Sequence, residues 1–218
     1  MNILIMGVAG SGKGTMAEFI KKHYKIPHIS SGEMFRESIR NKTPLGLLAK
    51  QYIDHGLLVP DDVTIQMVKE RLMQPDCDNG YLLDGFPRTM IQTGAFEKLI
   101  DDSSRELDKV INLNVGFEVL EERITGRRLC EDCGTIYNIH NHQPEVEGVC
   151  DVCGGKLYQR SDDTVQQLEI RIKEYEHLTK PVIDFYIGKG DVIQIDASKE
   201  VEEVWNELRT CLEEIDDH

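Results

Sequence analysis

The sequence has no long apolar run and an excess of acidic residues. Among its 218 residues the longest hydrophobic stretches, such as Ile3–Met6, fall far short of the roughly 20 residues that a membrane-spanning helix needs. The N-terminus has no basic segment of the kind that opens a secretory signal, so we expect a cytoplasmic protein without membrane association. The formal net charge of −14 argues against binding to nucleic acids or to anionic lipid surfaces.

Arginine is scarce in this acidic chain, with eleven residues in all. A site for phosphate groups would need its positive charge gathered in one place, because the chain as a whole repels anions. The composition is otherwise ordinary. Its 40% hydrophobic and 29% charged residues are typical of a globular protein, and the length allows one or two domains with a buried core.

Four of the six cysteines fall into two closely spaced pairs. Cys130 and Cys133 form one Cys-x-x-Cys motif, and Cys150 and Cys153 form a second one, separated from the first by sixteen residues. Four thiolates at this spacing are typical of a closed, tetrahedral, structural zinc site. The absence of a secretory signal argues against disulfides, and reduced thiols without metal are the remaining alternative.

The other candidate metal ligands do not belong to this set. Cys77 and Cys211 are isolated in the sequence, and we interpret them as ordinary buried thiols. His140 and His142 lie between the two motifs. Four thiolates already complete a zinc shell, so we expect both imidazole rings in solvent.

Short apolar runs alternate with helical patterns along most of the chain. The apolar runs, which we interpret as strands, cover residues 2–6, 81–83, 110–115 and 192–195. The helical patterns cover residues 13–24, 63–73, 90–100, 117–125 and 201–215. Strands that alternate with helices predict an α/β fold, in which a parallel sheet is covered on both faces and joined by right-handed crossovers.

Two segments interrupt this alternation and have the character of insertions. Residues 30–59 are mostly helical, with no clear strand, and begin with a sequence that resembles a capping box, Ser30 to Glu33. Residues 127–163 are rich in Gly, Cys, Asn and Pro and include a short β-like stretch at 135–139. The following segment predicts a long helix over 165–189, with Pro181 as a kink or break.

A glycine-rich loop, Gly7-Val-Ala-Gly-Ser-Gly-Lys-Gly-Thr15, follows the first strand and opens the first helix. Backbone N–H groups of such a loop converge on phosphate oxygens, and the helix N-terminus adds a positive dipole. Lys13 supplies a mobile ammonium for the β- and γ-phosphates. The general motif has its hydroxyl directly after the lysine, whereas here Gly14 intervenes before Thr15. The strand–loop–helix context favours nucleotide binding over a glycine-rich turn without ligand.

A second chemical signal is Asp84, which ends the apolar run Tyr81-Leu-Leu-Asp84. A carboxylate at the end of a strand would lie beside the glycine-rich loop, where it can hold the water shell of a Mg²⁺ ion. A carboxylate in an ordinary turn is the alternative.

Five motifs, taken in order, resemble the long-lid form of the adenylate kinases, a family of nucleoside monophosphate kinases. They are Gly7–Thr15, Ser31–Arg36, Leu83–Thr89, Gly126–Arg128 and Arg160–Asp163. Their order and spacing extend over essentially the whole chain. The resemblance implies an enzyme that reversibly transfers a phosphoryl group from MgATP to AMP and gives two ADP.

The same resemblance implies the architecture. The fold would be a phosphate-loop, five-stranded parallel sheet flanked by helices, with a core of residues 1–29, 60–126 and 164–218. Residues 30–59 would form a helical flap over AMP, and residues 127–163 a small zinc-ribbon-like lid over ATP. Closure of the two insertions would align the phosphates, and the protein would be a monomer whose partners are the nucleotides ATP, AMP and ADP.

The resemblance also implies which residues act on each nucleotide. Those on the ATP side are Gly10, Ser11, Gly12, Lys13, Gly14, Thr15, Arg127, Ile136, Tyr137 and Lys199. Those on the AMP side are Ser31, Arg36, Leu57, Leu58, Val59, Gly85, Phe86, Pro87, Arg88, Gln92, Arg160 and Arg171. Those implied in catalysis are Lys13, Asp84, Arg88, Arg123, Arg160 and Arg171.

These residue types suit phosphoryl transfer, which needs alignment and charge neutralisation rather than covalent help. The planar guanidinium of arginine binds phosphate through two N–H groups at once. Arg123 and Arg127 are four residues apart and would share a helix face if the helix continues that far. No general base is needed, because a phosphate-monoester oxygen is already ionised near neutral pH.

Three positions depart from the family pattern. Ala9 stands where proline is usual, Ser31 where threonine is usual, and Met16 where glutamine is common. The loop keeps its backbone donors and Ser31 keeps a hydroxyl, so none of the three changes the predicted reaction.

Two alternatives stay open at this stage. A kinase of the same fold could prefer another monophosphate such as UMP or CMP, or another donor such as GTP, although Thr89 and Gln92 resemble the adenylate pattern. A nucleotide-dependent switch could use the zinc ribbon to bind nucleic acid or a protein, but the ribbon carries both signs of charge and no basic stripe.

Overall fold

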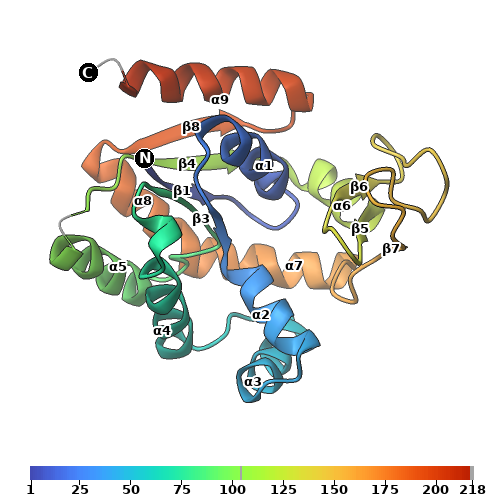
Figure 1. The fold of residues 1–218 in the computed structure, drawn as a ribbon, viewed down its shortest axis with the longest axis horizontal. Coiled ribbons are helices and arrows are strands. Elements are labelled where there is room, and N and C mark those ends of the chain that lie inside the picture. Colours follow the sequence, from blue (N-terminus) through green and yellow to red (C-terminus); the bar gives the residue numbers. More distant parts are fainter. Residues whose placement is uncertain (104, 217–218) are drawn as a thin grey trace.

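A five-stranded parallel sheet forms the centre of the molecule (Figure 1). The computed structural model describes residues 1–103 and 105–216. The strands lie in the order β2-β3-β1-β4-β8, and each neighbouring pair is parallel. Their bounds are β1 (Asn2–Met6), β2 (His28–Ser30), β3 (Tyr81–Asp84), β4 (Lys109–Asn114) and β8 (Val192–Asp196). The predicted α/β fold with a five-stranded parallel sheet is confirmed.

Helices cover both faces of this sheet because its strands are apolar on both faces. Side chains alternate along a strand, and in β1 Ile3 and Ile5 pack in one buried cluster while Leu4 and Met6 pack in another. The first cluster lies under α1 and α9, and the second lies under α4, α5 and α8. The bounds are α1 (Lys13–Tyr24), α4 (Asp61–Leu72), α5 (Met90–Ser103), α8 (Lys180–Lys189) and α9 (Val201–Asp216).

The edge strand β2 is the strand that the apolar pattern did not reveal. It has three residues, and only Ile29 among them is fully buried. Its last residue, Ser30, is at once the N-cap of the next helix, with an Oγ that accepts a hydrogen bond from the Glu33 N–H at 3.5 Å. A strand this short gives no detectable alternation.

The first insertion is a pair of helices, α2 (Ser31–Arg40) and α3 (Pro44–Ile53). Thr43 caps α3, because its Oγ1 accepts from the Gly46 N–H at 3.0 Å. The two helices pack closely at Gly46, where an added Cβ would lie 2.0 Å from the carbonyl oxygen of Ser38. Phe35 on α2 and Ala49 on α3 are buried in the same apolar cluster as Leu4 of the central sheet.

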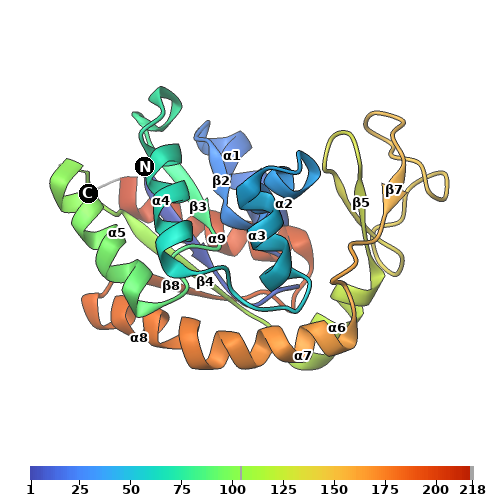
Figure 2. The same cartoon turned by 90° about the horizontal axis from the view of Figure 1, so that it is seen from below.

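The second insertion is a separate three-stranded antiparallel sheet that projects from one side (Figures 1 and 2). The order is β6-β5-β7, with bounds β5 (Arg127–Cys130), β6 (Ile136–Asn138) and β7 (Leu157–Tyr158). It follows α6 (Phe117–Gly126) directly. Its own buried cluster holds four residues: Cys130, Tyr137, Cys150 and Leu157.

A continuous helical segment runs from Val165 to Lys189, as predicted, and Figure 2 shows it as one rod along the molecule. It consists of α7 (Val165–Glu174), a π-helical stretch η2 (Tyr175–Thr179) and α8. Pro181 stands in the first turn of α8. Proline has no N–H and crowds the carbonyl one turn earlier, so the wider π turn accommodates it without ending the helix.

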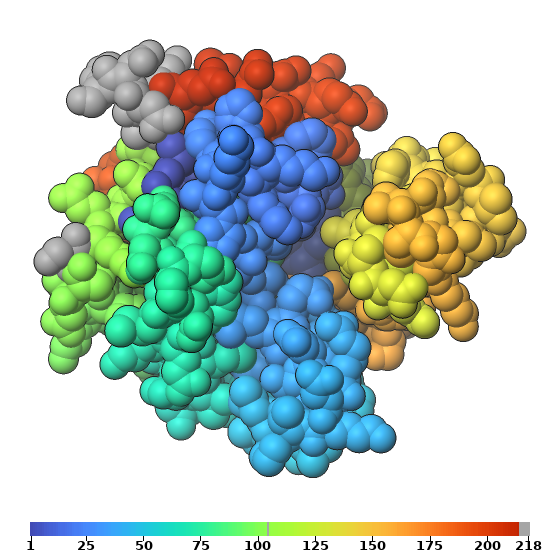
Figure 3. Space-filling model, in the orientation of Figure 1, coloured from blue at the N-terminus to red at the C-terminus, as the bar shows by residue number. Residues whose placement is uncertain are grey.

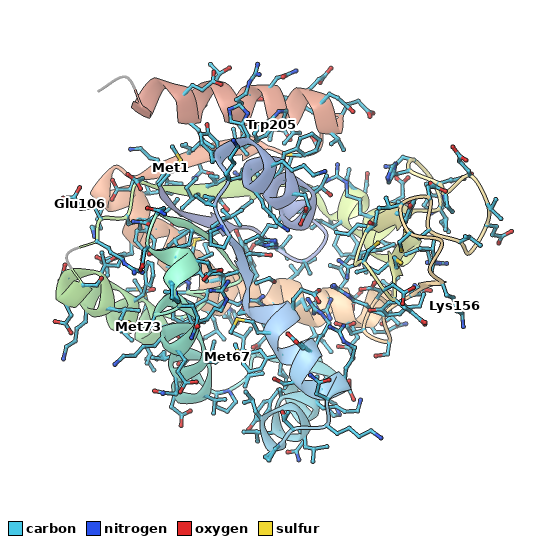
Figure 4. All side chains as sticks on the ribbon, viewed as in Figure 1. Met1, Met67, Met73, Glu106, Lys156 and Trp205 are labelled. Carbon is cyan, nitrogen blue, oxygen red and sulfur yellow. The ribbon has the colours of Figure 1, made fainter. Side chains whose placement is uncertain are left out.

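The helix α9 packs beside α1 on one face of the central sheet. Trp205, labelled in Figure 4, stacks on Phe19 of α1 with ring centroids 5.3 Å apart. The short 3₁₀ helix η1 (Pro75–Cys77) places Cys77 in the core, whereas Cys211 on α9 is half-buried. Across the described ranges, no helix is long and apolar enough to cross a membrane.

Candidate active site

The glycine-rich loop lies at the carboxyl end of β1, where the surface is hollowed between the core, the first insertion and the second (Figure 3). Gly10 and Gly12 have φ of 87° and 94°, a region that residues with a Cβ avoid. Gly12 in this conformation is the N-cap of α1. The loop therefore turns sharply and presents a helix N-terminus to the recess, an arrangement suited to binding phosphate.

Lys13 is the cation of this loop. Its Nζ donates hydrogen bonds to the carbonyl oxygens of Gly7 at 2.7 Å and Val8 at 3.0 Å. Burial lowers the pKa of the ammonium to about 8, against the opposing effect of the Asp84 carboxylate. Nearby guanidinium groups also contribute to the lowering, and they belong to Arg88, Arg127 and Arg171.

Asp84 lies beside this loop because β3 pairs with β1, with Asp84 opposite Ile5. Its side chain is buried, and Oδ2 is 3.4 Å from Nε2 of His28 on the neighbouring strand β2. Burial opposes ionisation, yet the hydrogen bond from His28 and the charge of Lys13 hold the pKa of the Asp84 carboxyl below its usual value. A buried, ionised carboxylate next to a phosphate loop has the chemistry needed to hold a hydrated Mg²⁺.

Side chains fix the segment after β3 by hydrogen bonds to its backbone groups. The carbonyl of Gly85 accepts from Ser31 Oγ at 2.7 Å and from Arg88 Nε at 2.8 Å. Gln92, at the start of α5, accepts the Arg88 N–H at 2.8 Å. Its amide nitrogen donates to Asp61 Oδ1 at 2.7 Å, so each end of the amide has one hydrogen-bond partner within the protein and can take a further one.

Asp61, which sequence reasoning did not single out, anchors this segment. Its Oδ1 accepts hydrogen bonds from Gln92 and from Thr89 Oγ1, the latter at 3.0 Å. Asp61 opens α4, directly after the connection that holds Leu57, Leu58 and Val59. Leu57 is half exposed and Val59 is buried in the main core. No sequence signal distinguishes Asp61 from the other acids of this chain.

The six predicted arginines converge on the recess from both insertions and the core. Burial lowers the pKa of Arg160 to about 10, and the charges of Arg36 and Arg127 lower it further. Burial also lowers the pKa of Arg88, with Asp84 opposing the shift and Arg171 adding to it. Each of these guanidinium groups therefore lies close enough to another one to affect its pKa.

Three carboxylates of the protein accompany this cluster as counter-ions. Glu33 contacts Arg36 at 2.8 Å and also pairs with Arg160, so it bridges the first insertion to the segment after β7. The other two, Asp162 and Asp163, are buried and pair with Arg171 and Arg127, respectively. Asp162 and Asp163 belong to the motif Arg160–Asp163 that the sequence analysis identified, but it assigned them no role.

Arg123 and Arg127 lie on different elements. The prediction that they share a helix face requires α6 to continue past Arg127, and this is wrong because α6 ends at Gly126 and Arg127 opens β5. Both still face the recess. An added Cβ on Gly12 would lie 3.8 Å from Arg123 Nη1. Burial lowers the Arg123 pKa, and the carboxylates of Glu122 and Glu200 oppose this shift.

Two predicted ATP-side residues differ in how they face the loop. Ile136 lies against it, since an added Cβ on Gly14 would be 3.1 Å from Ile136 Cδ1. Lys199 follows β8, is exposed, and donates to Glu207 of α9 at 2.6 Å. That hydrogen bond raises the Lys199 pKa, and the guanidinium cluster does not contribute to the shift.

The four cysteines of the two Cys-x-x-Cys motifs meet in the second insertion. Their Sγ atoms all lie within 4.8 Å of one another, with 3.4 Å between Cys130 and Cys153 and 3.6 Å between Cys133 and Cys150. A tetrahedral ion with Zn–S bonds of about 2.3 Å separates its sulfurs by about 3.8 Å, so the arrangement fits one shared ion. His140 and His142 are exposed, as predicted.

The comparisons with known proteins agree with this geometry. The family model described as adenylate kinase matches residues 5–191. The chain belongs to the adenylate kinase family. A curated adenylate kinase of Carboxydothermus hydrogenoformans is 50% identical over 213 residues, which covers 98% of this chain and all of that protein.

Other adenylate kinases give the same result. Those of Bacillus licheniformis and Clostridium tetani are 48% and 47% identical over 212 residues, which covers 97% of this chain and 98% of each relative. The predicted resemblance and the prediction of a kinase are therefore confirmed. The roles of single residues and the limits of the three parts stay predictions.

Proposed function

We propose that this member of the adenylate kinase family reversibly transfers the γ-phosphoryl group of MgATP to AMP and so forms two ADP. The observation that carries the proposal is the convergence of Lys13 and six arginines on the recess above the phosphate loop. In a chain with a net charge of −14, so much buried positive charge in one place serves to bind several phosphate groups.

The donor ATP would bind on the side of the phosphate loop and the second insertion. Backbone N–H groups from Gly10 to Thr15 would hold its phosphates, with the Lys13 ammonium on the β- and γ-phosphates. Arg123, whose guanidinium lies near Gly12 of the loop, is placed to meet the transferred group. Arg127, the backbone of Ile136 and Tyr137 and the segment at Lys199 would hold the remainder of ATP.

The acceptor AMP would bind on the side of the first insertion. Ser31, Arg36, the segment from Leu57 to Val59 and the segment from Gly85 to Arg88 surround its predicted position, and Gln92 would meet the adenine edge. Arg88, Arg160 and Arg171 lie between the two sides, where they would neutralise the phosphates being exchanged. The carboxylates of Glu33, Asp162 and Asp163 hold the guanidinium groups of Arg160, Arg171 and Arg127, respectively.

A magnesium ion fits beside Asp84, whose carboxylate is buried, ionised and next to the loop. When bound with ATP, the ion supplies charge neutralisation on the phosphate oxygens. The contribution of Asp84 is to orient the water shell of the ion. His28 would donate a hydrogen bond that keeps the Asp84 carboxylate ionised.

The parts that move would be the flap, residues 30–59, and the lid, residues 127–163, on a core of residues 1–29, 60–126 and 164–218. Closure excludes water, which would otherwise accept the phosphoryl group, and brings the two phosphate chains into line. The Glu33–Arg160 ion pair, which joins the flap to the lid side, supports this assignment.

The ion held by the four cysteines would be zinc in a structural role, since four thiolates leave no open coordination position. We further propose that the protein acts as a monomer in the cytoplasm. All the positive charge of the proposed site comes from one chain, and a thiolate site of this kind persists in a reducing compartment.

The test is a panel of acceptors. Purified protein is mixed with MgATP and, separately, AMP, UMP, CMP or GMP, and the nucleoside diphosphates are quantified; GTP replaces ATP in a second series. Rapid ADP formation with AMP alone supports the proposal. Faster transfer to another monophosphate overturns the assigned acceptor, and ATP binding without any transfer overturns the reaction in favour of a nucleotide-dependent switch.

A further inference from the structure

The short strand β6 has two faces with different surroundings. Side chains alternate along an extended backbone, so Thr135, which directly precedes β6, and Tyr137 point to one side and Ile136 to the other. Ile136 lies against the phosphate loop at Gly14. Thr135 and Tyr137 lie against the four cysteines. One strand thus separates the proposed metal centre from the proposed ATP site.

Each of the two residues on the metal side brings a hydroxyl to a cysteine sulfur. Thr135 Oγ1 is 3.0 Å from the Sγ of Cys133. Tyr137, 2% exposed, has its hydroxyl 3.5 Å from the Sγ of Cys150. The two cysteines come from the two different Cys-x-x-Cys motifs, so the strand is attached to both halves of the metal centre.

The direction of the hydrogen bond between Tyr137 and Cys150 follows from the second partner of the Tyr137 hydroxyl, the backbone of Asp151. The phenol oxygen accepts the N–H of Asp151 at 2.8 Å, which leaves its own proton free to donate to Cys150. A metal-bound thiolate is an acceptor only, so the same direction holds for Thr135 and Cys133. Hydrogen bonds of this kind orient ligands and tune the metal site.

On its other side β6 is bound to the elements that carry the arginines. It pairs with β5, where Arg127 lies opposite Asn138. The Asn138 side chain donates from Nδ2 to the backbone carbonyl of Arg123 at 3.2 Å. A displacement of β6 therefore changes the position of Ile136 over the loop and of two predicted phosphate ligands.

We propose that Thr135 and Tyr137 are positioning residues, whose hydroxyl–sulfur hydrogen bonds fix β6 to the metal centre and so hold its Ile136 face in place for ATP. The inference rests on the proposed function, in that it takes the phosphate loop as the ATP site. The metal centre then does more than keep the lid folded, because it sets the geometry of donor binding through two hydroxyl groups.

The test uses the full-length, zinc-loaded protein and the variants Tyr137→Phe, Thr135→Val and their combination. These substitutions keep the ring or the branched shape and remove the hydroxyl. Two quantities are measured: the rate of zinc release to a chelator, and the Kd for ATP and for AMP by titration. Direct titration reports ATP binding whether or not transfer occurs, so a failure of the proposed reaction is seen separately in the wild-type assay.

We expect zinc affinity to fall by about 10-fold or more in the double variant, as for other hydrogen-bonding partners of metal ligands, and this loss is measured as faster release of zinc to the chelator. The Kd for ATP rises by about fivefold, which corresponds to roughly one lost hydrogen bond, while the Kd for AMP stays unchanged. Ile136→Ala, on the opposite face, raises the Kd for ATP without faster zinc release. Tyr158→Phe, a hydroxyl deletion on β7 of the same sheet, changes neither.

Two results would overturn the proposal. If the double variant releases zinc faster but binds ATP as the wild type does, the hydroxyls serve the metal site alone. If zinc release is unchanged, the hydroxyls do not act on the metal centre, whatever happens to ATP binding.

Discussion

The flap and the lid are both insertions into one sheet, but they are held in different ways. Phe35, Ala49 and Val59 of the flap belong to the same buried cluster as the strands of the core. The lid has a separate cluster of four buried residues, and two of these, Cys130 and Cys150, are proposed metal ligands. A small unit without an apolar core of sufficient size needs another cross-link, and an ion held by the four cysteines would supply it.

The first prediction concerns the flap. Phe35→Ala removes a large buried side chain from the main core, so it should lower the free energy of unfolding by about 3–5 kcal/mol. Urea unfolding measures the loss, and Phe117→Ala, at a position 44% exposed, is the matched control. A small effect of Phe35→Ala would show that the flap, like the lid, is not part of the core.

The second prediction concerns Lys13, which belongs to the core and to neither insertion, and it separates an effect on the reaction from an effect on stability. Lys13→Gln should lower kcat by about 100- to 1000-fold, the range found when one donor to a transition-state oxygen is lost. The melting temperature should not fall, since a buried ammonium costs desolvation. Lys22→Gln on the exposed side of the same helix serves as the control. An equal loss in that variant would contradict the role of Lys13.

The third prediction uses pH to tell the ATP side from the AMP side. Burial holds the pKa of Lys13 at about 8, so the free enzyme loses this positive charge as the pH rises through 8. Between pH 8 and 9, kcat/KM for ATP should fall toward a tenfold decrease per pH unit, and ATP binding should take up protons. Arginines stay charged there, so kcat/KM for AMP at saturating ATP should stay level. Parallel decreases for both substrates would contradict this assignment.

The fourth and smallest effect is expected at the anchor of the AMP side. Asp61→Asn weakens the hydrogen bonds from Thr89 and Gln92, and we expect KM for AMP to rise by about fivefold, which corresponds to about 1 kcal/mol. KM for ATP should stay constant. Asp62→Asn, at the exposed neighbouring position, is the control. A rise in both KM values would show that the substitution disturbs the whole site rather than the AMP side alone.

The sequence was sufficient for the parts of the site that depend on local chemistry. The loop from Gly7 to Thr15 and the two Cys-x-x-Cys motifs each lie within a short segment, and their spacing determines what they can bind. The alternation of strands and helices indicated the sheet, because each of the longer strands is a continuous apolar run. The assignment of residues to ATP and AMP came from family resemblance and awaits experiment.

Features that depend on contacts between distant segments could not be predicted. Asp61 acquires its role only when α4 packs beside α5, and Glu33 only when it meets Arg160, far along the chain. The strand β2 was missed because Ser30 belongs to both a strand and a helix cap. The change from helix to strand at Arg127 follows from pairing with β6, which periodicity does not reveal.

The most direct test of the account is hydrogen exchange of the backbone amides before and after removal of the metal, at constant pH and temperature. We predict that amides of residues 127–163 lose their protection when the metal is removed, while those of β1, β3 and β4 and of the flap helices α2 and α3 keep theirs. Lid amides that stay protected in protein shown to be free of metal would contradict the claim that four thiolates around one ion replace a hydrophobic core in the lid.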